Sequence, residues 1–224
     1  MPQRIVVINP NSTVAVTRGM DAALAPLRLP GGPAIESLTL PEGPPGIETE
    51  EHVAAVVAPL CRLIEREDAG ADAFVIACFS DPGLHAARER TGKPVFGIME
   101  AGLTAALNLG AGIGIVAILD RSIPRHRRAF RAMGIDARIA GELALGVPVV
   151  ELADERRTFG RMLEVGAALR DRDGADVLVL GCAGMAQYRE RLQDELKIPV
   201  IDPTQAAVGM ALAAVRIGLR RGAR

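Results

Sequence analysis

An internal repeat constrains this chain more than any other feature of its sequence. One copy runs from Gly70-Ala71-Asp72 through an aliphatic stretch to Cys78. The other runs from Gly174-Ala175-Asp176 through a similar stretch to Cys182. Each cysteine follows its glycine by eight residues, and a Pro-Val step follows after sixteen residues in one copy and seventeen in the other. This duplication predicts two similar α/β lobes related by a pseudo-twofold axis.

Strand-like and helix-like segments alternate along the chain, which predicts a mostly parallel sheet in each lobe with helices on both faces. Near-continuous aliphatic runs are typical of such covered strands. The expected strands are residues 4–8, 34–38, 73–77, 95–97, 112–119, 136–140, 176–180 and 200–201. The expected helices include residues 50–67, 82–91, 156–170, 188–196 and 204–219.

The 224 residues are enough for two such lobes with buried cores. We expect a first lobe of residues 1–97 with 205–224, carrying Cys78. We expect a second lobe of residues 98–204, carrying Cys182.

Composition and patterning exclude several classes of function. A formal net charge of −1, one Tyr and no Trp argue against nucleic-acid binding. Residues 101–119 carry no charge, but their glycines favour a helix, a turn and a strand over a membrane span. The N-terminus lacks an apolar signal stretch, so we expect a cytoplasmic protein. Three cysteines at this spacing match neither a disulfide framework nor a zinc site, so no metal is expected.

The repeated cysteines lie where chemistry is expected in this class of fold. Cys78 and Cys182 each follow an expected strand and precede a helix. Ligands bind at the carboxyl ends of parallel strands. A helix N-terminus is expected to lower the pKa of a thiol, and its N–H groups can bind a developing anion.

A pseudo-twofold axis would make the two thiols face each other across a cleft. Racemisation needs this geometry, because one group removes a proton from one face of a carbon while another returns a proton to the opposite face. The alternative is that both cysteines are small buried hydrophobes, the commoner fate of free cysteine. Their matched positions favour chemistry, whereas Cys61 has no repeat partner and is expected in the core.

A polar turn follows the first strand at the same sheet edge. Asn11 or Ser12 is suited to cap the next helix. Asn9 and Asn11 are equally suited to present amides to a polar ligand, with Ser12 as a further substrate-binding candidate, and both interpretations stay open.

Other signals have simpler interpretations. Residues 112–117 match a dinucleotide fingerprint by letters, but their glycines begin a strand instead of following one. Lys93 and Lys197, the only lysines, are expected far from the cysteines, which disfavours pyridoxal phosphate. His85 and His126 are expected to be solvated. We interpret the basic stretch 122–128 as a solvated face of a helix. The less favoured alternative is that Ser122 in this stretch contacts a substrate anion.

Five segments resemble the hydantoin and allantoin racemases of the aspartate/glutamate racemase superfamily. They are residues 8–13 (INPNST), 77–84 (ACFSDPGL), 94–101 (PVFGIMEA), 180–185 (LGCAGM) and 198–202 (IPVID). Two departures, Thr49-Glu50 in place of the usual Gly-His and a strand ending at Leu119 without paired threonines, concern the expected substrate side.

The resemblance implies a cofactor-independent racemase of Asp/Glu racemase-like fold, in which Cys78 and Cys182 are the two bases. It also implies a homo-oligomer and a small-molecule substrate. Substrate contacts are implied at Ile47 and at backbone N–H groups around Phe79, Ser80, Ala183 and Gly184.

The expected reaction is inversion of a carbon alpha to a carbonyl, with C5 of a 5-substituted hydantoin as the leading substrate. The nearest alternative is an aspartate or glutamate racemase, which the weakly polar Phe79-Ser80 and Ala183-Gly184 disfavour. A cysteine-dependent decarboxylase or isomerase is a further alternative. A decarboxylase would be expected to retain only one of the two cysteines, whereas both are present here. A non-catalytic binding protein or a thiol redox switch with a reversible Cys78–Cys182 disulfide represents a different class.

Overall fold

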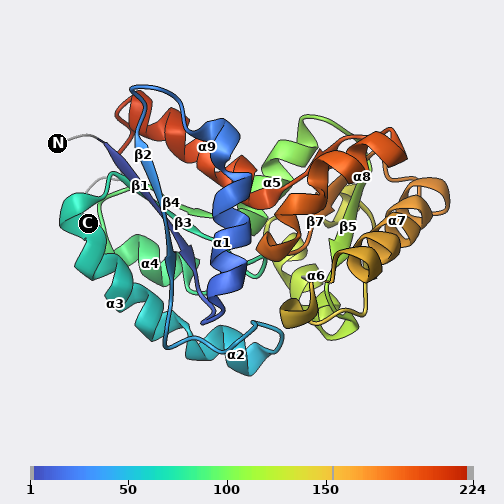
Figure 1. Ribbon diagram of the computed structural model, residues 1–224, viewed down its shortest axis with the longest axis horizontal. Helices are drawn as coiled ribbons and strands as arrows, with labels where there is room; N and C mark the ends of the chain where they lie inside the picture. Colours follow the sequence, from blue (N-terminus) through green and yellow to red (C-terminus); the bar gives the residue numbers. More distant parts are fainter. Residues whose placement is uncertain (1–2, 153, 221–224) are drawn as a thin grey trace.

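Two four-stranded parallel sheets, each flanked by helices, form the computed structural model, which describes residues 3–152 and 154–220 (Figure 1). The strand orders are β2-β1-β3-β4 and β6-β5-β7-β8, so the two halves repeat one topology. The strands are β1 (Arg4–Asn9), β2 (Ala34–Thr39), β3 (Ala73–Ile76), β4 (Val95–Gly97), β5 (Ile113–Ala117), β6 (Ile139–Ala144), β7 (Val177–Leu180) and β8 (Val200–Ile201). The predicted fold class is confirmed.

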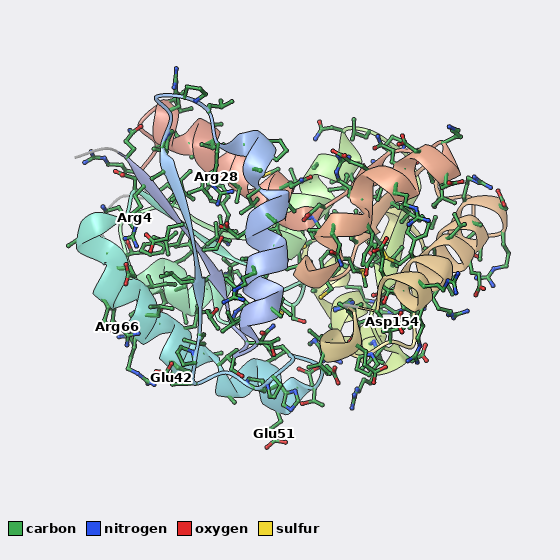
Figure 2. All side chains as sticks on the ribbon, in the orientation of Figure 1. Arg4, Arg28, Glu42, Glu51, Arg66 and Asp154 are labelled. Carbon is green, nitrogen blue, oxygen red and sulfur yellow. The ribbon has the colours of Figure 1, made fainter. Side chains whose placement is uncertain are left out.

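The helices cover both faces of the sheets and bury aliphatic strands between them. They are α1 (Val14–Ala23), α2 (Glu50–Ala55), α3 (Val57–Glu67), α4 (Leu84–Arg90), α5 (Ile98–Leu107), α6 (Ile123–Ala132), α7 (Glu155–Asp171), α8 (Arg189–Leu196) and α9 (Pro203–Arg216). Single 3-10 turns include η4 (Asp136–Arg138), η5 (Val149–Glu151) and η6 (Ala183–Tyr188). Charged side chains such as Glu51, Arg66 and Asp154 lie on the outside (Figure 2).

Helices α5 and α9 join the two halves. Helix α5 follows β4 and packs on β5, β7 and β8, whereas α9 follows β8 and packs on β1, β3 and β4. The two helices contact each other, and an added Cβ on Gly102 of α5 would lie 2.7 Å from the Cβ of Pro203. A glycine therefore permits this close crossing.

Two expected elements were wrong in detail. The expected helix at residues 50–67 is two helices, α2 and α3, which are separated at Val56. Pro59 accounts for the break, because its ring excludes the carbonyl of the residue four positions earlier, Ala55, from a continuous helix. The expected strand at residues 136–140 begins with the turn η4, and β6 starts only at Ile139.

The uncharged segment 101–119 forms the end of α5, a turn and strand β5, as predicted. Within the described residues, no helix has the length and hydropathy that a membrane crossing requires.

Candidate active site

Cys78 and Cys182 line one cavity between the two sheets. They follow β3 and β7, which occupy equivalent positions in the two strand orders. The cavity has a volume of about 40 Å³, room for a few water-sized groups. It is lined by Asn11, Val16, Ile47, Ala77, Cys78, Phe79, Ser80, Ile118, Ser122, Arg125, His126, Val149, Gly181, Cys182 and Ala183. The repeat therefore brings the two thiols to a shared cavity.

A buried carboxyl group anchors the loop that carries Cys78. Asp81 has a φ of 43°, and its carboxyl oxygens accept hydrogen bonds from the N–H groups of Met99 and Glu100, both at 2.9 Å. An added Cβ on Gly97 would lie 2.2 Å from the Asp81 carboxyl carbon, so only glycine leaves room for this contact. Burial raises the pKa of Asp81 to about 7.

In the second half, a buried carboxyl group from another position of the repeat caps the joining helix α9. Asp202 follows the repeated proline by three residues, as Gly97 does in the first half. Its Oδ1 atom accepts hydrogen bonds from Thr204 at 2.6 Å and Gln205 at 3.3 Å, at the start of α9. Both halves therefore hold a buried carboxyl group at the start of the joining helix.

Burial dominates the acidity of the two thiols, contrary to our expectation of a lowered pKa. Burial raises the pKa of Cys78 to about 11, although hydrogen bonding by Ser80 and the charge of Arg125 oppose it. Burial raises the pKa of Cys182 to about 12, and the Gly184 N–H, 3.3 Å from Sγ, opposes it. Both thiols are therefore protonated at neutral pH.

The expected helix effect is weak for a geometric reason. Helix α4 begins only at Leu84, six residues after Cys78, so that thiol does not lie at its first turn. Cys182 precedes the 3-10 turn η6 instead of an α-helix. Since the helix dipole acts within the first turn, desolvation outweighs it here.

Arg125 is a cavity residue that the sequence analysis missed. Its side chain is buried, with the residue 9% exposed, and its Nε donates to Ser80 Oγ at 2.9 Å. A guanidinium group can only donate, so the Ser80 oxygen accepts and its own hydrogen is left to face another acceptor. The sulfur of Cys78 is such an acceptor. Arg125 thus places positive charge beside one of the two thiols.

The prediction that His126 is solvated is wrong. His126 is 2% exposed, its Nδ1 lies 2.6 Å from Glu142 Oε1, and its ring meets Phe79 edge-on at 5.3 Å. Ser122 is buried beside it and also lines the cavity. The solvated interpretation of 122–128 holds only for part of the stretch, because positions 122, 125 and 126 form one inward helical face. His85 is exposed, as predicted.

The turn after β1 divides into cavity and support residues. Asn11 lines the cavity, whereas Asn9 is fully buried and donates to Asn11 Oδ1 and Thr17 Oγ1, both at 3.0 Å. The Asn11 side chain accepts from the Thr13 N–H, which forms a local turn. Ser12 lines neither this cavity nor its neighbour.

The remaining predicted positions lie close to the thiols. Ile47, Phe79, Ser80 and Ala183 line the thiol cavity, whereas Gly184 lines an adjoining cavity.

Few of the described residues have side chains that are placed to bind a cofactor or a metal at the thiols. Lys93 donates to the carbonyl of Ala71, and Lys197 is the C-cap of α8; neither lines the thiol cavity. Among the described residues, no three His, Cys, Asp or Glu side chains cluster as a metal site would require. The polar side chains that line the thiol cavity besides the cysteines are those of Asn11, Ser80, Ser122, Arg125 and His126.

Comparison with known proteins identifies related sequences and structures. Residues 5–211 match the family described as Asp/Glu/Hydantoin racemase. A hydantoin racemase from Pseudomonas sp. (strain NS671) is 35% identical over 217 residues, 96% of this chain and 87% of that protein. An allantoin racemase from Klebsiella pneumoniae is 34% identical with a TM-score of 0.90, covering 98% of this chain and 90% of that one. An allantoin racemase from Pseudomonas fluorescens is 28% identical with a TM-score of 0.93, covering 98% and 94%.

Proposed function

This chain belongs to the Asp/Glu/hydantoin racemase family, and we propose that it inverts C5 of a 5-substituted hydantoin without a cofactor. Cys78 and Cys182 are the acid/base pair in this proposal. The single observation that carries it is the shared cavity, lined by one cysteine from each half of a duplicated fold.

The proposed reaction moves two protons and leaves the bonds of the ring intact. A thiolate removes the C5 proton from one face and becomes a thiol, and the electron pair delocalises toward the neighbouring C4 carbonyl oxygen. The opposite thiol returns a proton to the other face and becomes a thiolate. The two cysteines exchange roles, so the next turnover starts from the opposite enantiomer or after proton exchange with solvent.

Polar groups of the cavity support the charged states of this reaction. The backbone N–H of Gly184 contacts the sulfur of Cys182 at 3.3 Å, and Ser80 hydrogen-bonds Cys78. We therefore assign these two groups to thiolate stabilisation. The buried cation of Arg125 offsets the negative charge on Cys78, because a nearby opposite charge favours the ionised form.

Arg125 also favours one alternative, racemisation of an acidic amino acid. A guanidinium group pairs well with a substrate carboxylate. The residues that follow the cysteines, Phe79 and Ala183, are apolar and offer no side chain to a second carboxylate. The hydantoin therefore remains the leading substrate.

Polarimetry of enantiopure 5-isobutylhydantoin, aspartate and glutamate with chelator-treated enzyme tests this function. We expect the rotation of the hydantoin to decay to zero well above the uncatalysed rate, while both amino acids keep theirs. Decay with an amino acid alone would establish the alternative substrate. Decay of the hydantoin only after addition of a metal ion would contradict a cofactor-independent reaction.

A further inference from the structure

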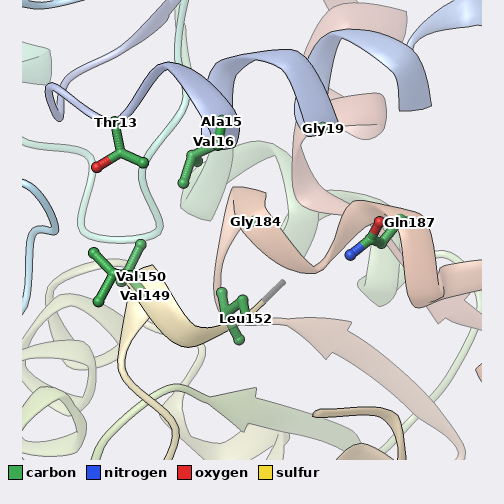
Figure 3. A pocket seen from close by; sticks show the side chains of 9 residues that line it. All are labelled: Thr13, Ala15, Val16, Gly19, Val149, Val150, Leu152, Gly184 and Gln187. Carbon is green, nitrogen blue, oxygen red and sulfur yellow. The ribbon is translucent and has the colours of Figure 1, made fainter. Parts of the chain in front are cut away.

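A second cavity adjoins the thiol cavity and has a different character. It has a volume of about 140 Å³ and lies between α1, the segment that contains η5, and η6 (Figure 3). The two cavities share Val16 and Val149 as walls. We call this second space the side cavity; it is lined by Thr13, Ala15, Val16, Gly19, Val149, Val150, Leu152, Gly184 and Gln187.

The side cavity reaches the thiol of Cys182 at Gly184. An added Cβ on Gly184 would lie 3.6 Å from Cys182 Sγ and 2.9 Å from the Leu152 Cδ1 atom. A side chain at this position would therefore stand between the sulfur and the side cavity. Glycine keeps this space free of side-chain atoms.

The lining of the side cavity is mostly aliphatic, and its polar side chains are those of Thr13 and Gln187. None of the residues that form it carries a charge, and the hydroxyl of Thr13 is already donated to the carbonyl of Pro45 at 2.7 Å. Val150 is 56% exposed at the wall of the cavity. A large apolar side chain left in water at such a wall favours the binding of an apolar group.

Substrate size links the two cavities. The thiol cavity holds only about 40 Å³, so a substituent on the reacting carbon has to extend out of it. We infer that the side cavity receives the C5 substituent of the substrate and selects uncharged, apolar groups over polar ones. A ureido substituent, as in allantoin, would bury several N–H and C=O groups with Gln187 as the main side-chain partner, and unpaired polar groups are costly to bury.

Gly19 is a wall residue of the side cavity at which a larger side chain can be added. It lies within α1, and nothing lies within 4 Å of a Cβ added there. A larger residue would therefore extend into open space without a clash at Cβ. Leucine also favours helix more than glycine does, so Gly19→Leu is expected to keep the fold.

The test compares Gly19→Leu with Gly160→Leu. Gly160 is also an exposed glycine inside a helix, α7, with nothing within 4 Å of an added Cβ, but it does not line either cavity. Each variant and the parent enzyme are assayed for racemisation of 5-methylhydantoin, 5-isobutylhydantoin and allantoin, with an enzyme-free control for each.

The parent enzyme is expected to have a higher kcat/KM for 5-isobutylhydantoin than for allantoin. Gly19→Leu is expected to lower kcat/KM for 5-isobutylhydantoin at least about tenfold, and for 5-methylhydantoin by less than about twofold, because the lost apolar burial concerns only the longer group. Gly160→Leu is expected to change neither.

This inference rests on the proposed function, and the same assay separates their failures. If the parent racemises 5-methylhydantoin but Gly19→Leu affects both hydantoins equally or neither, the inference is overturned and the function stands. A preference for allantoin over 5-isobutylhydantoin in the parent also overturns it. If the parent racemises none of the three, both proposals fail.

Discussion

Replacement of either cavity cysteine by serine is expected to lower the rate of hydantoin racemisation at least about a thousandfold, a loss typical of a missing acid/base group. Cys78→Ser leaves no thiolate on one face, and Cys182→Ser leaves none on the other. The serine hydroxyl has nearly the same shape but ionises far less readily than a thiol.

Cys61 provides the matched control. It is the third cysteine of the chain, lies in α3 and is buried away from the thiol cavity. We expect Cys61→Ser to keep racemisation within about twofold of the parent once the folded fraction is measured by circular dichroism. If Cys78→Ser or Cys182→Ser racemises as fast as Cys61→Ser, that thiol is not part of the acid/base pair.

Arg125→Met is expected to lower kcat/KM by about tenfold to a hundredfold at neutral pH, because loss of a nearby cation raises the pKa of a thiol by one unit or more.

In the parent, kcat/KM should rise about tenfold per pH unit between about pH 6 and pH 8. The sign follows from the raised pKa of Cys78, about 11, since the thiolate fraction increases with pH throughout that range. A plateau above about pH 7 would contradict the raised pKa.

A direct titration of the thiol separates this role of Arg125 from a structural one. In a Cys61→Ser/Cys182→Ser background, Cys78 is the only thiol left in the chain. Arg125→Met should slow its alkylation by iodoacetamide by the same factor as it lowers turnover, and Arg125→Lys should restore part of the rate. Arg127→Met, an exposed arginine on the same helix, is the control. Unchanged alkylation with impaired turnover would mean that Arg125 acts on the substrate.

The repeat was sufficient to predict the fold because its physical consequences are local. Aliphatic runs between Gly-Ala-Asp and cysteine form β3 and β7, and the short connections that follow place both cysteines at strand ends. The break at Val56 was also open to prediction, since Pro59 lies where a continuous helix cannot accept it.

The environment of the thiols was harder to predict because it depends on contacts between distant segments. Arg125 and His126 belong to a basic stretch that composition alone assigns to the surface. In the structure both side chains are buried, where Arg125 hydrogen-bonds Ser80 and His126 hydrogen-bonds Glu142. The spacing of Ser122, Arg125 and His126 on one helical face was the signal available in the sequence.

The acidity of the thiols illustrates the same limit. Position before a helix predicts a lowered pKa, but the pKa of both thiols is raised by burial between two halves whose cysteines are about one hundred residues apart in sequence. Asp81 and Asp202 likewise occupy non-equivalent positions of the repeat, so their common role at the starts of α5 and α9 becomes visible only in three dimensions.

The most direct test of a two-thiol reaction is the fate of the C5 hydrogen in D₂O at early conversion. Enantiopure 5-isobutylhydantoin is incubated with enzyme, the enantiomers are separated, and deuterium at C5 is measured in each by proton NMR against an enzyme-free control. Two thiols on opposite faces predict deuterium at C5 of the product enantiomer, because the thiol that reprotonates the opposite face has exchanged with D₂O. The remaining substrate keeps its hydrogen, because a proton removed to the first sulfur can return only from that sulfur to the original face. Deuterium entering the remaining substrate as fast as the product forms would contradict the two-thiol account and indicate a single base that exchanges with solvent on both faces.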